Sequence, residues 1–184
     1  MTGILGGLLG SFKSGFAEPA YQFIATATGT GASGVIDFTS IPSTYKHLQI
    51  RYAGRASTSA TINLTINNIT TASYVRHSLL GNGSTATSTA SAASQTSISM
   101  PDSLGSGGPT TGHTAGIIDI LDYTSSTKNK TIRATYGNLV GSNNLIYLTS
   151  GAIFNTTEIT SVKLTASAGN FATTSRFSLY GIKG

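Results

Sequence analysis

The chain has no cysteine and no tryptophan, and only 9% of its residues carry a charge. The absence of cysteine excludes disulfides, thiol catalysis and thiolate metal ligands, although it leaves the redox compartment open. Glutamate occurs only at Glu18 and Glu158, and oppositely charged pairs at helical i,i+4 spacing are almost absent. Long amphipathic helices are therefore not expected.

Small and hydroxylated residues take the place of the charged ones. The 184 residues include 22 glycines, 25 serines and 29 threonines. The length suits one domain that buries a core without a metal or disulfide staple. The chain is neither charged enough nor proline-rich enough to be disordered or a linker.

From residue 20 onward, short stretches of alternating apolar and polar residues are separated by turn-forming residues, which predicts about nine or ten β-strands. The residues expected to share the inward faces of three such strands are Leu48, Ile50 and Tyr52; Ile62, Leu64 and Ile66; and Phe177 and Leu179. The stretch around Ile117 to Leu121 is apolar on both faces, so it is expected at the centre of a sheet or under a neighbouring subunit.

Two segments look like long exposed loops. Residues 84–97 are of low complexity and contain no large apolar side chain, and residues 101–114 are rich in glycine and proline. The dipeptide Asn82-Gly83 suits a tight type I′ turn, but we expect a longer loop after it and no immediate return strand.

These patterns predict an all-β protein, an antiparallel β-sandwich of jelly-roll type with an N-terminal arm. Residues 20–184 form the sandwich domain and residues 1–19 form the arm. An immunoglobulin-like sandwich is the alternative, but the chain lacks the cysteines and tryptophan typical of its best-known forms.

The arm is apolar and rich in glycine. Its candidate partner-binding residues are Ile4, Leu5, Leu8, Leu9, Phe12 and Phe16. A signal peptide is disfavoured, because no positive residue precedes the apolar stretch and four glycines interrupt the first ten residues. The stretch is also too short to span a bilayer, so no membrane contact is expected. An exposed apolar arm usually implies a surface that covers it.

The formal net charge of +5 does not point to nucleic acid, because the eleven lysines and arginines are dispersed and form no basic run. We expect no nucleic-acid partner. A dispersed positive charge suits contact with an acidic surface equally well.

Few residues could carry catalysis. Asp119 and Asp122 are the nearest pair of carboxylates, but three residues apart on a strand they point to opposite faces. A triad of Asp102, His113 and a serine has no supporting motif. Finally, His47, His77 and His113 show no metal-ligand spacing. The sequence therefore predicts a protein that is not an enzyme and holds no metal or cofactor.

Several phrases carry a resemblance: FTSIPSTYKHLQIRY (38–52), HSLLGNGS (77–84), IIDILDYTSSTKNKTIRA (117–134), ITSVKLTASAGNF (159–171) and SRFSLYGIKG (175–184). They resemble segments of β-rich virion structural proteins of tailed bacteriophages. The resemblance covers residues 20–184. It implies a non-enzymatic building block of the virion, assembled in the host bacterial cytoplasm, with a jelly-roll-like domain that forms a homotrimer.

Two roles are compatible with that resemblance. The favoured one is a capsid decoration or cement protein that binds the assembled major capsid protein through the arm. The alternative is a tail fibre, spike or other adhesive tail component whose loops at 84–97 and 101–114 touch a host glycan. Both segments lack phenylalanine, tyrosine and tryptophan, which adhesive loops often carry, so the first role is favoured.

Overall fold

The computed structural model describes residues 19–91, 94–104, 112–140 and 143–184. Within these ranges every regular element is a β-strand. The described part contains no helix that is long and apolar enough to cross a membrane.

The described residues form twelve strands. They are β1 (Tyr21–Thr28), β2 (Val35–Phe38), β3 (His47–Gly54), β4 (Ala60–Ile66), β5 (Tyr74–Gly81), β6 (Ala86–Ala90), β7 (Ile98–Leu104), β8 (Thr114–Leu121), β9 (Lys130–Val140), β10 (Asn143–Ile153), β11 (Val162–Ala166) and β12 (Arg176–Ile182). The expectation of nine or ten strands is too low, because β6 and part of β7 fall in segments expected to be loops.

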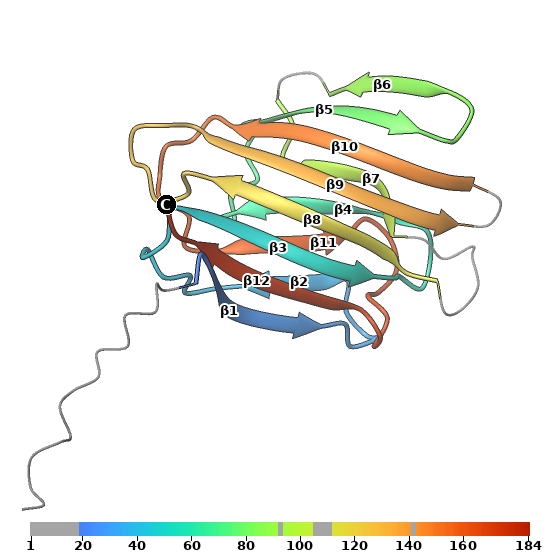
Figure 1. Cartoon of the computed structure of the whole chain (residues 1–184), viewed down its shortest axis with the longest axis horizontal. Coiled ribbons are helices and arrows are strands. Elements are labelled where there is room, and N and C mark those ends of the chain that lie inside the picture. The colour runs from blue at the N-terminus through green and yellow to red at the C-terminus, as the bar shows by residue number, and fades with distance from the viewer. Residues whose placement is uncertain (1–18, 92–93, 105–111, 141–142) are drawn as a thin grey trace, which may run out of the picture.

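The strands form two antiparallel sheets packed as a sandwich. The larger sheet has eight strands in the order β1-β12-β3-β8-β9-β10-β5-β6, and the smaller has four in the order β2-β11-β4-β7. Figure 1 shows the larger sheet in front of the smaller one. Every connection crosses between the sheets except those within β5-β6 and β8-β9-β10, whose consecutive strands all lie in the larger sheet.

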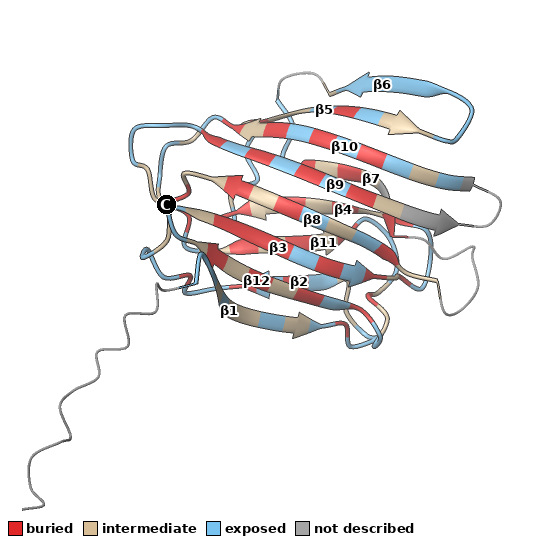
Figure 2. Cartoon of the chain, viewed as in Figure 1, coloured by how far each residue is buried: buried red, intermediate tan, exposed pale blue. Residues whose placement is uncertain are grey.

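The core lies between the sheets and is built from alternate residues of each strand. Figure 2 shows buried and exposed bands alternating along the strands of the larger sheet. The Tyr52 and Phe177 rings stack with centroids 5.4 Å apart, and those of Tyr136 and Tyr147 stack at 5.0 Å. Such aromatic pairs add to the stabilisation that burial of apolar surface gives.

The faces predicted for three strands are confirmed. All eight side chains expected to point inward from β3, β4 and β12 are buried. Strand β8 lies fourth in the larger sheet, which confirms its expected central position. Five of the eight tyrosines are also buried, and four of these five lie on strands.

The prediction of a loop over residues 84–97 was wrong in part. Residues 86–90 form β6, which pairs with β5 across the short connection 82–85. The side chain of Asn82 closes this turn by accepting hydrogen bonds from the backbone N–H groups of Ser84 (3.0 Å) and Thr85 (2.8 Å), and Gly83 adopts a φ of 87°. All five residues of β6 are exposed, so the strand needs no apolar side chain to form.

The prediction of a loop over residues 101–114 was also wrong in part, because it overlaps β7. Ile98, Met100 and Leu104 are buried, so this strand contributes to the core. Pro101 interrupts the alternation of apolar and polar residues, so the sequence does not indicate a strand here. Proline is nevertheless tolerated, because β7 is an edge strand of the smaller sheet. The register against β4 is irregular between Ala60 and Ile62, and the Ile62 N–H donates to Ser103 Oγ at 2.7 Å.

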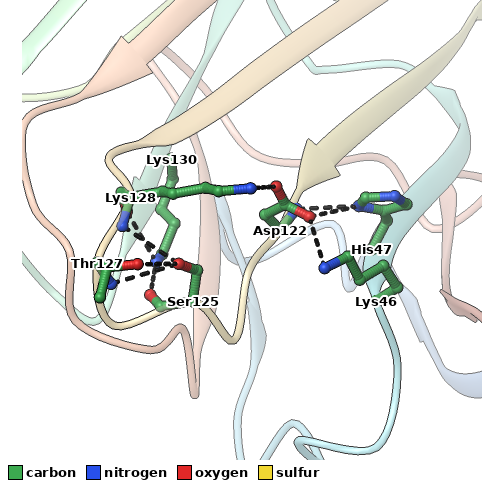
Figure 3. A network of polar contacts seen from close by, with 7 residues as sticks. All are labelled: Lys46, His47, Asp122, Ser125, Thr127, Lys128 and Lys130. Atoms are coloured by element: carbon green, nitrogen blue, oxygen red, sulfur yellow. Dashed lines mark hydrogen bonds and ion pairs between the residues drawn. The ribbon is translucent and has the colours of Figure 1, made fainter. Parts of the chain in front are cut away.

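The loop between β8 and β9 is held by a polar network (Figure 3). The Asp122 carboxylate lies 2.8 Å from Lys128 Nζ and 3.3 Å from Lys46 Nζ. The Asp122 backbone N–H donates to His47 Nδ1 at 2.9 Å. The hydrogen bonds from Lys128, and then those from Lys46, hold the pKa of Asp122 below its ordinary value. This network supports the loop and fixes the end of β8.

We expect Asp122→Asn to lower stability at neutral pH but not at low pH. Asparagine tolerates the positive φ of 47° at this position, so the backbone is kept and the ion pairs are lost. Because the folded pKa lies below the unfolded value of about 3.9, the carboxylate stabilises the fold above that pH and the benefit is lost as the pH falls. Denaturant unfolding of both proteins between pH 7 and pH 3 measures this. A stability difference that stays constant over that range would contradict it.

Candidate interaction surface

The histidines do not assemble a site. His47 accepts the Asp122 N–H, and His113 Nε2 lies 2.8 Å from Thr174 Oγ1 in another loop. His77 lies on β5 and is exposed. The described residues contain no group of three or more histidine and acidic side chains that could hold a metal ion.

The carboxylates weighed for catalysis have separate partners. Asp119 accepts a hydrogen bond from Gln49 Nε2 at 2.7 Å on β3, whereas Asp122 binds lysines at the end of β8. The side chain of Asp102 lies outside the described part of the molecule, so the structure does not test the triad with His113 that the sequence disfavoured. Among the described groups, none of these interactions pairs a nucleophile with a base.

A different feature stands out on the outer face, which we define as the face of the eight-stranded sheet that points away from the smaller sheet. Across six strands of this face, one register row consists largely of small residues. From β3 the row runs through Ala53, Ala115 and Gly137 to Ile146, and it continues to Gly81 and Ala86. We call it the small-residue row.

The neighbouring row of the outer face is apolar and is called the aliphatic row. Ile117 pairs with Thr135, which pairs with Leu148, which pairs with Leu79. Ile117, Ile146, Leu148 and Leu79 are between 42% and 60% exposed. Single exposed apolar residues need no explanation, but a contiguous apolar strip of this kind marks an interaction site.

The two rows create hollows in the surface. One of them, here called the trough, has a volume of about 520 Å³; Ala53, Ala115 and Gly137 lie along its base, with Ile117 and Ile146 beside them. A second hollow of about 340 Å³ shares Thr135 and Ile146 with it. A third, of about 280 Å³, shares Leu79 and Leu148 with the second. The three therefore form one continuous strip across the sheet.

An arginine and aromatic cluster lies at the β1 side of the outer face. The guanidinium of Arg51 lies 5.2 Å from the ring centroids of both Tyr21 and Tyr180. The Phe23 ring meets Tyr180 edge to face at 6.0 Å. Tyrosine and arginine are the residues that most often dominate binding energy at protein interfaces.

The outer face is positively charged. Arg51, Arg133 and Arg176 lie on its strands, and Asp119 is the one acidic residue in the sequence of all eight strands of that sheet. Arg133 is the cross-strand partner of Asp119, so that pair is balanced. Arg51 and Arg176 both line the trough. The apolar strip therefore carries a cationic end.

Sequence patterns did not identify this surface. The residues at the base of the trough are 84 positions apart at their extremes, Ala53 and Gly137, and only the register of β3, β8 and β9 brings them together. The sequence signal that could have indicated this surface is the recurrence of small residues at outward-facing strand positions. The arm residues Ile4, Leu5, Leu8, Leu9, Phe12 and Phe16 lie outside the described residues, so the arm stays a prediction.

Comparison with known proteins gave no match to a family model, to a curated protein or to a solved structure.

Proposed function

We propose that this chain is a non-enzymatic structural protein of a tailed-bacteriophage virion, most specifically a decoration protein that binds the assembled shell. The observation that carries the proposal is the apolar strip of the outer face, which is large, continuous and uncovered in the single chain. A strip of this kind suits permanent contact with another protein.

We also propose that the sandwich is a jelly roll. Eight strands support this: β1-β12-β3-β8 faces β2-β11-β4-β7, and in chain order these strands alternate between the two sheets except at β4 and β7, which are neighbours in the smaller sheet. The antiparallel pairs β1 with β12, β2 with β11, β3 with β8 and β4 with β7 nest as in a folded antiparallel ribbon. Jelly rolls are frequent in viral capsid domains, which is a fold-level association in favour of the proposed role.

The proposed partners are the major capsid protein and two further copies of this chain. Strand β6 supports self-association, because it ends the larger sheet, is fully exposed and contains no charged residue or proline. Natural proteins usually protect such an edge, or pair it with a neighbouring chain. The proposed location is the virion, after assembly in the host cytoplasm.

A tail fibre or spike that contacts host glycan is the second candidate. One observation favours it: Tyr21 and Phe23 are 46% and 61% exposed, and aromatic faces of this kind can stack on sugars. Binding of the isolated protein to a glycan array, lost in Phe23→Ala, would favour this role over decoration.

Substitution on the outer face tests the decoration role directly. We expect the double variant Ile146→Asp, Leu148→Asp to remain folded, because both side chains are exposed, and to lose co-sedimentation with particles stripped of this protein. Thr131→Asp is the control, since Thr131 is exposed on the outer face of β9 and lines none of the three hollows. Equal binding by the double variant and the control would contradict the proposal.

Deletion of residues 1–16 tests the arm. We expect the truncated protein to fold and to form the same oligomer, because the described domain starts after the deletion. If the arm anchors the protein, the truncated form no longer binds particles. Unchanged binding to particles would show that the arm is not the anchor.

A further inference from the structure

We infer that the trough binds an extended segment of a partner protein that carries a carboxylate about three residues from an aliphatic side chain. The inference rests on the proposed function only in taking the occupant to be a protein. It follows from the two halves of the trough, which differ in chemistry: a cationic end on β12 and β3, and an apolar end on β8 to β10.

The guanidinium of Arg51 is preorganised to bind a carboxylate. Its guanidinium stands between the rings of Tyr21 and Tyr180, and its Nε donates to Gln49 Oε1 at 2.7 Å. Gln49 is itself anchored through Asp119. Among the described residues, Nη1 and Nη2 of Arg51 have no hydrogen-bond partner. A guanidinium held in this way loses little conformational entropy when it binds a carboxylate through two parallel hydrogen bonds.

Arg176 adds a second positive charge at the same end. It is the cross-strand partner of Ala53 and lies at the β12 end of the small-residue row. The side chain is exposed, and the described part of the chain offers it no hydrogen bond or ion pair. None of the described residues that line the trough is acidic, so the charge of this end is left for a ligand.

The other half of the trough suits an aliphatic side chain. Ile117 and Ile146 stand on β8 and β10, on either side of Gly137 on β9. Gly137 has no side chain and Ala115 only a methyl group, so an extended backbone can approach the sheet closely there. Strands lie about 4.8 Å apart, so β3 and β9 are separated by roughly 10 Å, which about three extended residues span.

The charge of the trough favours a segment of another protein over a second copy of this chain as its occupant. A second copy of the outer face would bring the same two arginines and no unpaired carboxylate, whereas an acidic and aliphatic segment matches both halves of the trough. Like charges placed together oppose association, and complementary charges increase its rate and specificity.

The test uses the full chain with labelled isoleucine methyl groups and three capped synthetic peptides of equal length in a serine and threonine background. The first carries a glutamate three residues before a leucine, the second a lysine in place of the glutamate, and the third a serine in place of the leucine. We expect the first to shift the methyl signals of Ile117 and Ile146 saturably, and the other two to bind at least about tenfold more weakly.

Charge reversal provides the internal control. Arg176→Glu should weaken binding of the glutamate peptide and strengthen binding of the lysine peptide. Lys163→Glu, on β11 of the smaller sheet and away from the trough, should leave both unchanged. Arg51→Lys should also weaken binding of the glutamate peptide, because the lysine ammonium cannot donate two parallel hydrogen bonds to one carboxylate as a guanidinium does.

Three results would overturn the inference: equal binding of the glutamate and lysine peptides, no saturable shift at Ile117 or Ile146, or self-association in sedimentation that Ile146→Asp abolishes. The last would assign the trough to a second copy. A further outcome is that no peptide binds the trough while the double variant Ile146→Asp, Leu148→Asp still loses co-sedimentation with particles. In that case the proposed function stands, and only the ligand chemistry inferred for the trough is wrong.

Discussion

Replacing Lys130 with alanine is expected to lower the free energy of unfolding by about 3–5 kcal/mol, because it removes the donor from a buried polar cluster. Lys130 is fully buried, and its ammonium donates to the backbone carbonyls of Ser125, Lys128 and Thr156, as the loop in Figure 3 shows in part. Each carbonyl left without a partner costs about 1–3 kcal/mol. Denaturant unfolding at neutral pH measures the loss.

Two variants separate hydrogen bonding from packing. Lys130→Met keeps most of the volume but has no donor, so it should also be strongly destabilised, whereas Lys128→Ala removes a side chain that is 63% exposed on the same loop and should cost less than about 1 kcal/mol. A Lys130→Met protein as stable as the wild type would contradict this account.

The effect depends on pH in a defined direction. Burial holds the pKa of Lys130 below its ordinary value. Between the folded value and the unfolded value of about 10.4, the unfolded chain binds more protons than the folded one, so the contribution of Lys130 to stability rises with pH in that window. The free energy of unfolding of the wild type, relative to that of Lys130→Met, should therefore increase as the pH approaches about 10.4, the ordinary pKa of lysine.

Adding a side chain at Gly116 is the second large effect. A Cβ there would lie 2.5 Å from Cε1 of Tyr52 and 2.7 Å from Cβ of Tyr136, closer than real contacts allow. The Tyr52 ring cannot easily move because it stacks on Phe177. Gly116→Ala should lower the free energy of unfolding by about 1–3 kcal/mol, and Gly116→Val by more.

Gly137 supplies the control on the neighbouring strand. A Cβ at Gly137 would meet only the backbone oxygen of Leu145 at 3.5 Å, an ordinary contact. Gly137→Ala should therefore be neutral or stabilising by up to about 1 kcal/mol, because alanine loses less conformational freedom on folding. Equal destabilisation at the two positions, measured by thermal or denaturant unfolding, would show that the close packing under Gly116 is not the cause.

The sequence predicts those strands whose inward residues are large and apolar. Leu48, Ile50 and Tyr52 alternate cleanly with polar residues, and their burial follows from that period of two. Strand β6 gives no such signal, because an exposed edge strand forms through main-chain hydrogen bonds alone. In β7 the period is interrupted by Pro101, which an edge position allows.

The outer face could not be predicted in the same way. Alternation assigns Ile117 and Ile146 to strands, but it does not tell which strands become neighbours. The trough depends on the pairing of β3, β8, β9 and β10, and its cationic end depends on β12 returning beside β3 from the far end of the chain. Long-range register of this kind is set by the whole fold, which no local pattern encodes.

Cryo-electron microscopy of the intact particle that carries this chain tests the central claim most directly. The account predicts density at repeated sites on the shell, with the outer face turned toward a shell protein and the strip from Ile117 to Leu79 covered. Density confined to the tail, or an outer face open to solvent in every copy, would contradict it.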